Sequence, residues 1–178
     1  MTIKFAILGL LSWQPMTGYD LKKRFADMEA LYWSGNNNQI YRTLVALHKD
    51  NLVTQEIEHQ DGSPSRKIYS ITVKGRVALR EWVQQTPALP QVRNHFLIQL
   101  AWTDQLKADE LDALLSDYAE ELAVKLLMLR EQQQRDGSGP QRSPRETYLW
   151  QMIDASWRAF YENELNWVRK LRADLVEF

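Results

Sequence analysis

The 178-residue sequence has no cysteine and no long apolar run. Without cysteine, disulfide scaffolds, thiolate metal sites and thiol nucleophiles are excluded. The apolar stretch between Lys4 and Gln14 covers about ten residues, which is too short to cross a bilayer, and no small-residue cleavage site follows it. We therefore expect a soluble cytoplasmic protein that does not enter a membrane.

The sequence also lacks the motifs that perform catalysis or hold metals. It has no glycine-rich phosphate loop and no Ser/His/Asp motif with a recognisable nucleophile elbow. Its three histidines, His48, His59 and His95, lie far apart without the spacing of metal ligands. We therefore expect no enzyme, no metal site and no cofactor.

What is present is an ordinary globular composition, 44% hydrophobic and 25% charged, with a net charge of −1. That net charge by itself argues against a nucleic-acid partner, but the charges are unevenly placed. Residues 1–86 carry 11 Lys and Arg against 8 Asp and Glu, whereas residues 87–178 carry 11 against 15. A mildly basic front half and an acidic back half fit a DNA-binding domain joined to a domain that does not bind DNA.

The first two helices are predicted by periodicity and by a cap. Apolar residues recur at helical spacing from Ile3 to Leu11, and Pro15 stops that pattern. In Thr17–Asp20 the threonine hydroxyl and the aspartate carboxylate can each accept from the other residue's amide, as in a capping box with Asp in place of Glu. We expect the second helix to cover roughly residues 18–32.

A third helix follows residues 34–36, where Ser34 and Asn36 are the candidate caps. Its core face consists of Ile40, Leu44 and Leu47. The other face carries hydrogen-bonding and cationic groups with one small apolar residue, at Asn38, Tyr41, Arg42, Val45 and Lys49. A recognition helix needs such a face, because amides read base edges in the major groove while hydroxyl and cationic groups hold phosphates. A solvated surface is the alternative.

The period then changes from helical to two, which predicts a β-hairpin over residues 53–58 and 66–71 with a polar tip at residues 60–65. Thr72 opens a fourth helix whose apolar face is Leu79, Trp82 and Val83. Three helices, a hairpin and a fourth helix are the plan of a winged helix-turn-helix. Arg66 and Lys67, beside the tip, either meet phosphates or serve as the charged residues of an edge strand.

Five blocks of the front half follow one another in a characteristic order, and they are Gly18–Leu21, Gln39–Leu44, Asn51–Val53, Ser65–Thr72 and Gly75–Arg76. Together they resemble the PadR family of transcriptional regulators. The chain from Val92 onward is similar to the subgroup with a long helical C-terminal domain, which includes phenolic-acid-decarboxylase repressors and a virulence activator. The resemblance covers essentially the whole chain.

The resemblance implies a homodimer that binds a two-fold-symmetric operator in double-stranded DNA, with the third helix in the major groove and the wing alongside. It assigns DNA contacts to Asn37, Asn38, Gln39, Tyr41, Arg42, Ser65, Arg66 and Lys67, to which the polar helix face adds Lys49. The family often has Gly where Asn51 stands, and Asn tolerates the left-handed conformation better than most residues. Three consecutive asparagines begin the third helix, where the family commonly has a start that contains Ser or His. The operator sequences of relatives therefore do not predict the operator of this protein.

The back half begins after a stiff linker at residues 87–91. A brief helix is expected around Phe96, and a long one from Leu111 to near Arg135. Ser143, Pro144 and Glu146 supply a cap, a first-position proline and an acid at the third position, so they predict the start of a last helix that runs toward the end of the chain. We assign residues 1–86 to DNA binding and residues 92–178 to dimerisation.

The last helix carries a near-heptad apolar stripe made of Trp150, Ile153, Trp157, Phe160, Trp167 and Leu171. A stripe of this length needs partner helices, and a second copy of the chain is the natural source of some of them. Glu164 interrupts the stripe, and it either fixes the register or lies at the edge.

Four aromatic residues, Trp102, Trp150, Trp157 and Tyr161, either line a pocket for a flat aromatic effector or simply pack. The expected fold is thus mainly α (α+β), with an N-terminal winged helix-turn-helix and a C-terminal long-helix dimerisation domain. The expected function is a repressor that a small aromatic effector releases. The alternative is a winged-helix protein-interaction or activator module without strong autonomous DNA binding.

Overall fold

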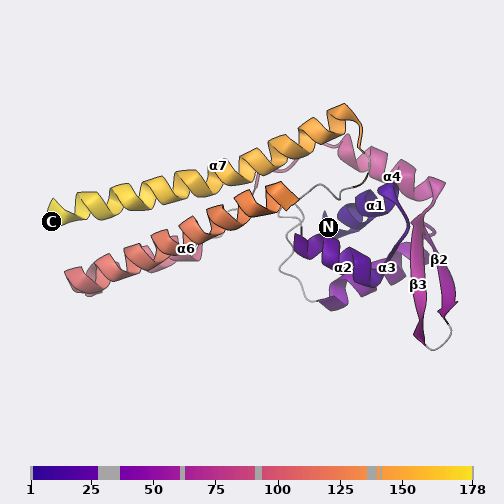
Figure 1. Cartoon of the computed structure of the whole chain (residues 1–178), viewed down its shortest axis with the longest axis horizontal. Helices are drawn as coiled ribbons and strands as arrows, with labels where there is room; N and C mark the ends of the chain where they lie inside the picture. Colours follow the sequence, from indigo (N-terminus) through magenta and orange to yellow (C-terminus); the bar gives the residue numbers. More distant parts are fainter. Residues whose placement is uncertain are drawn as a thin grey trace. The chain divides into compact units, whose positions relative to one another are not determined.

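The computed structural model describes residues 2–27, 37–60, 63–90, 94–135, 140 and 142–177, and the statements below concern these residues. The chain forms two compact units, Met1–Ala88 and Leu89–Phe178, each of which is described by itself. Figure 1 shows a small helical unit with a projecting hairpin and a second unit of long antiparallel helices. No helix within the described ranges is both long and apolar enough to cross a membrane.

The N-terminal unit combines helices with a small antiparallel sheet of strand order β1-β3-β2. Its elements are α1 (Thr2–Trp13), β1 (Met16–Thr17), α2 (Gly18–Asp27), α3 (Asn37–Lys49), β2 (Val53–Gln60), β3 (Ser63–Ile71) and α4 (Val73–Val83). This arrangement confirms the predicted winged helix-turn-helix. The periodicity did not reveal β1, because a two-residue strand exists only through its pairing with β3, at Met16↔Tyr69 and Thr17↔Ile68.

The core of the N-terminal unit is apolar and is drawn from every element of the unit except α4. Its buried residues are Ile3, Ile7, Leu8, Leu10, Leu11, Met16, Leu21, Phe25, Ile40, Leu44, Leu47, Leu52, Val53 and Tyr69. Helix α4 adds Leu79 at the edge of this core, and its Trp82 ring stacks on Phe5 with centroids 4.7 Å apart. Val83, which the sequence placed on the same apolar face, is the last residue of α4 and is 63% exposed.

Two local predictions at the ends of α2 and α3 are confirmed. The amide of Thr17 donates to the Asp20 carboxylate at 3.0 Å, and the amide of Asp20 donates to the Thr17 hydroxyl at 3.1 Å, which completes the capping box. Asn51 has a φ of 58°, in the left-handed region that ends many helices. Helix α2 is described as far as Asp27, so the rest of its predicted span and both candidate caps of α3 lie outside the described residues.

The C-terminal unit is built on two long antiparallel helices, which lie side by side in Figure 1. Its elements are α5 (His95–Leu100), η2 (Thr103–Gln105), α6 (Ala108–Arg135), α7 (Pro144–Asp174) and η4 (Leu175–Glu177). The start of α7 is as predicted: the Ser143 hydroxyl accepts from the Glu146 amide, and Pro144 occupies the first turn.

Helix α5 is held against α6 and α7 by a mixed aromatic and polar contact. The Phe96 ring stacks on Tyr118 with centroids 3.9 Å apart and meets Trp167 edge-on at 6.2 Å. Glu164 accepts from the Asn94 amide group at 2.7 Å and from the Tyr118 hydroxyl at 3.0 Å. Neither interpretation of Glu164 from the sequence included these bonds, which join three helices of one chain.

Candidate nucleic-acid interface

Helix α3 has one buried face and one exposed face, as an amphipathic recognition helix requires. On the buried side, Ile40, Leu44 and Leu47 are 6%, 0% and 1% exposed. The exposed side is made of Asn38, Tyr41, Arg42, Val45 and Lys49, and we call these residues the polar face of α3. Gln39 is half-buried, and the side chain of Asn37 lies outside the described residues.

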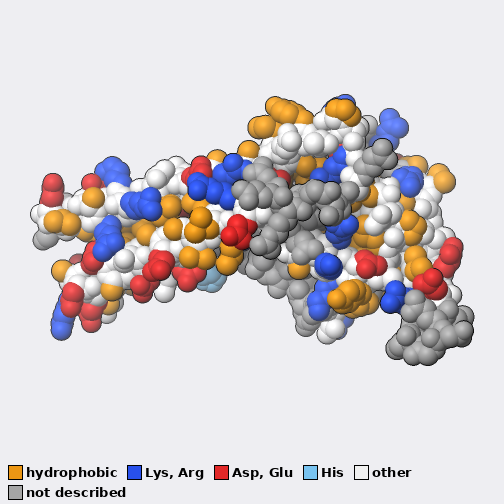
Figure 2. Space-filling model, in the orientation of Figure 1, with side chains coloured by type: hydrophobic (Ala, Val, Ile, Leu, Met, Phe, Trp, Pro, Cys, Tyr) orange, Lys and Arg blue, Asp and Glu red, His pale blue; other side chains and the backbone are white. Residues whose placement is uncertain are grey.

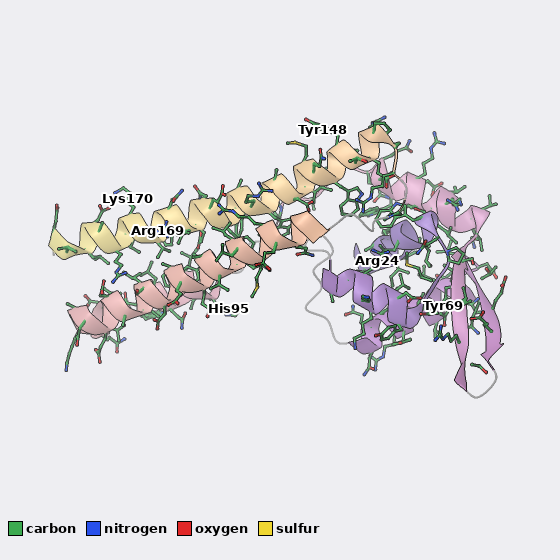
Figure 3. The ribbon with its side chains drawn as sticks, viewed as in Figure 1. Arg24, Tyr69, His95, Tyr148, Arg169 and Lys170 are labelled. Atoms are coloured by element: carbon green, nitrogen blue, oxygen red, sulfur yellow. The ribbon has the colours of Figure 1, made fainter. Side chains whose placement is uncertain are left out.

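Tyr41 is a residue of the polar face that lies close to another helix. Its side chain is 47% exposed, and its ring lies against Gly18 at the start of α2. Burial of the Tyr69 side chain raises its pKa, and the nearby Tyr41 phenol makes a second, smaller contribution in the same direction. Tyr69 lies on β3, where it is labelled in Figure 3, and its hydroxyl donates to the Gln55 side chain at 3.1 Å. Tyr41 is thus the member of the polar face that contacts α2 and approaches the sheet.

The wing is the hairpin of β2 and β3. On β3, Ser65, Arg66 and Lys67 are all exposed. Arg66 lies opposite Glu58, and Lys67 lies opposite Ile57. Directly opposite residues of antiparallel strands hold their Cβ atoms roughly 5 Å apart, so the carboxylate of Glu58 offsets part of the positive charge that Arg66 contributes. On the face drawn in Figure 2, several separate Lys and Arg side chains are visible over the N-terminal unit.

Short hydrogen bonds tie the end of α3 to the wing and to α4. The Thr72 hydroxyl donates to the carbonyl of Asn51 at 2.8 Å and accepts from the Gly75 amide at 3.0 Å. The Thr72 amide donates to the carbonyl of Leu52 at 3.0 Å, and Lys74 donates to the carbonyl of Asp50 at 2.9 Å. These bonds hold the polar face of α3 in a fixed relation to the root of the wing.

The residues predicted for dimerisation divide between two environments on α7. Leu171 packs against the core of the C-terminal unit, which also contains Leu165 and Val168. In contrast, Ile153, Phe160 and Trp167 are 37%, 43% and 37% exposed. Trp150 and Trp157 are half-buried. At about 100° per residue, the exposed stripe and the buried face lie roughly a quarter turn apart, so α7 can pack on α6 and still present apolar side chains outward.

The four residues predicted for an effector pocket are only partly brought together. The Trp157 and Tyr161 rings lie 6.3 Å apart, and Lys125 lies 5.7 Å from the Tyr161 ring. Trp150 lies instead over the Arg142 guanidinium at 4.9 Å. Trp102 is 71% exposed and follows α5, which contacts α7 about five helical turns beyond Trp150. The effector pocket stays a prediction.

Comparison with known families covers both units. Residues 7–81 match the transcriptional regulator PadR-like family, and residues 92–175 match the virulence activator alpha C-terminal domain. The negative transcriptional regulator PadR of Bacillus subtilis is 28% identical over 125 residues, which make up 70% of this chain and 69% of that protein.

Solved structures are similar over nearly the full length. Bacillus subtilis PadR in complex with operator DNA has a TM-score of 0.84 and 25% identity, and the match covers 97% of this chain and 98% of that one. The same protein in complex with p-coumaric acid has a TM-score of 0.78 and 23% identity, over 97% and 98% of the two chains, so it shows the fold alone. The virulence activator AphA of Vibrio cholerae has a TM-score of 0.71 and 26% identity over 98% of both chains. This chain belongs to the PadR-like family and is a transcriptional regulator with a C-terminal domain of the virulence-activator type.

Proposed function

We propose that this regulator is a homodimeric repressor that binds a two-fold-symmetric operator with the polar face of α3 in the major groove and the wing alongside. The observation that carries the proposal is the division of α3 into a fully buried apolar side and an exposed side with amide, phenol and guanidinium groups. Those groups are the ones that read base edges and hold phosphates. The likeness to a PadR structure that holds operator DNA supports binding to an operator.

The proposed contacts divide by chemistry. Asn37, Asn38, Gln39 and Arg42 can make base contacts at the start of the helix, whereas Tyr41 and Lys49 are suited to phosphates. On the wing, Ser65, Arg66 and Lys67 are exposed and can reach an adjacent phosphate or minor groove. The opposing Glu58 makes Arg66 the weaker of the two wing cations in this proposal.

The dimer is proposed from the apolar residues that α7 leaves on the surface. Along one side of this helix Leu149, Ile153, Phe160 and Trp167 recur at spacings of four and seven residues, and each is more than a third exposed. A stripe at this spacing is the pattern with which helices pair across an interface. Two copies joined there would carry two α3 helices, as a two-fold operator requires.

The proposal also includes release from the operator by a small aromatic ligand. What supports it is the group of Trp157, Phe160 and Tyr161, whose rings contact one another, with the cation of Lys125 beside them. A planar carboxylate would match both the aromatic rings and the cation. p-Coumaric acid is a suitable probe, and the proposal expects it to lower the affinity for the operator.

The test is a binding titration of the DNA upstream of the regulator's own gene, with and without Arg42→Ala. Each phosphate contact should lower the log of the binding constant by about 0.9 per log unit of salt. If Arg42 reads a base, Arg42→Ala should weaken specific binding by roughly 1–3 kcal/mol. The matched control is Arg80→Ala, which removes the same charge from an exposed position of α4 and should change little.

The outcomes separate the proposal from its alternative. A steep salt dependence together with an effect of Arg42→Ala alone supports DNA binding through α3. An equal weakening on all sequences assigns Arg42 to a phosphate. A flat salt titration would contradict the proposal and favour a protein-docking module.

A further inference from the structure

Gly18 occupies a position in which a side chain would collide with one residue only. A Cβ atom built there would lie 2.4 Å from Cε1 of Tyr41 and 3.1 Å from both Cδ1 and Cζ, and these are its three nearest neighbours. Gly18 itself is buried, so the ring of Tyr41 covers the first residue of α2. The space that a side chain at Gly18 would occupy is therefore filled by the ring of Tyr41, a residue of the polar face of α3.

Backbone geometry does not explain the glycine. Gly18 has no positive φ of the kind that side chains avoid, and it begins a helix whose capping box is formed by its neighbours Thr17 and Asp20. Alanine is a better helix former than glycine. The local chain would thus accept a side chain at this position, and the requirement for glycine comes from Tyr41.

Tyr41 also lies near enough to the sheet for its phenol to contribute to the raised pKa of Tyr69, which is buried and whose hydroxyl donates to the Gln55 side chain. The contact with Gly18 limits the Tyr41 ring on its inner side, while nearly half of the side chain is exposed. Restricted rings lose less conformational entropy when they bind a ligand.

We infer that Gly18 is a positioning residue for operator binding, which acts by seating the ring of Tyr41 so that its hydroxyl is held ready for the DNA backbone. The inference rests on the proposed function and deepens it, because it assigns a role to a residue that does not itself face the DNA. A Cβ at Gly18 would displace the exposed ring, which can swing outward, rather than any backbone atom. The Gly18→Ala variant should therefore keep the fold, but its Tyr41 ring should no longer be held in the orientation that favours DNA binding.

The experiment is a double-mutant cycle on the full-length chain with Gly18→Ala, Tyr41→Ala and the combined variant. Tyr41→Ala should lower operator affinity on the order of tenfold, as expected for the loss of a hydrogen bond to a charged group. Gly18→Ala should lower it by a large part of that factor, and should have no further effect when Tyr41 is already alanine. Gly9→Ala is the matched control, because a Cβ at Gly9 meets nothing within 4 Å.

A second readout follows the ring without DNA. Nitration of Tyr41 by tetranitromethane, located by mass spectrometry, should be faster in Gly18→Ala while the Tm stays within a degree or two of the parent. An affinity loss from Gly18→Ala that persists at full size in the Tyr41→Ala background would overturn the inference and leave the proposed function standing. So would faster nitration with unchanged affinity. If the parent chain does not bind the operator at all, that result contradicts the proposed function itself, and with it the inference about Gly18.

Discussion

The N-terminal and C-terminal units are similar in length but differ in where they keep their large apolar side chains. Among the described residues, the N-terminal unit buries fourteen hydrophobic residues in one core, whereas the C-terminal unit buries six. Helix α7 leaves Tyr148, Leu149 and Met152 between 49% and 59% exposed. In Figure 2 hydrophobic side chains are visible along both long helices.

Geometry explains this difference. Two helices of 28 and 31 residues are rods about 42–46 Å long that touch along one side only. The N-terminal unit instead packs helices and a sheet around a shared core. The comparison indicates a unit that folds on its own contacts joined to a unit that needs a partner, and the following experiments test that distinction.

The largest effect is expected from truncation after Ala88. The N-terminal unit should stay folded because its core is complete, but it should be monomeric and bind the operator about 10²–10⁴-fold more weakly, since the second half-site no longer acts as an intramolecular contact. Analytical ultracentrifugation and a binding titration measure the two effects. A truncated chain that still dimerises would show that the dimer contact lies in the N-terminal unit.

Gly75→Ala should have the next largest effect, and it tests how tightly the N-terminal unit is packed. A Cβ at Gly75 would lie 2.2 Å from the carbonyl oxygen of Leu52 and 2.8 Å from Ile71. Because a backbone atom cannot move aside as a ring can, we expect a loss of about 2–3 kcal/mol in unfolding free energy. Gly9→Ala, which meets open space, should instead raise the unfolding free energy by up to about 1 kcal/mol. Equal denaturation midpoints for the two variants would contradict this account.

The smallest effect concerns an exposed ion pair of the C-terminal unit, between Arg172 and Asp112. Arg172 donates to the Asp112 carboxylate at 2.7 Å, and this hydrogen bond holds the pKa of Asp112 below its ordinary value of 3.8. A carboxyl with a lowered pKa stabilises the folded state above its unfolded pKa, and that contribution disappears as the pH falls through the lowered value. Asp112→Asn should thus lower the Tm slightly at neutral pH and not at all in strong acid.

Asp117→Asn is the control for this pH series, since it removes a carboxylate from an exposed position of the same helix. The two variants should differ at neutral pH and converge on acidification. A gap between them that widens as the pH falls would show that the ion pair with Arg172 has no part in stability.

Features that depend on neighbouring residues were predictable from the sequence. The capping box at Thr17 and Asp20 and the start of α7 at Ser143 follow from the chemistry of a few consecutive residues, and both are present. The left-handed conformation of Asn51 was expected instead from the family resemblance, since the family often has Gly at this position. The amphipathic division of α3 was also predictable, because helical spacing alone places Ile40 and Leu44 opposite Arg42.

Features that depend on residues far apart in the sequence were not predictable from it. Strand β1 exists only because Met16 pairs with Tyr69, and the role of Glu164 follows from Asn94, which lies 70 residues away. The contact between Gly18 and Tyr41 has the same origin, since periodicity within α3 says nothing about which residue of α2 lies beneath the ring. Local patterns specify faces of helices, whereas the docking of one element on another decides which residues meet.

The hydrogen bonds of Thr72 have a consequence for how this regulator can respond to a signal. One side chain links Asn51, in the turn that follows α3, to the first turn of α4 at the point where β3 ends. Because these bonds hold α3 and α4 together, we expect a ligand that releases the operator to change the spacing of two such surfaces against a duplex repeat of about 34 Å, rather than the surface itself.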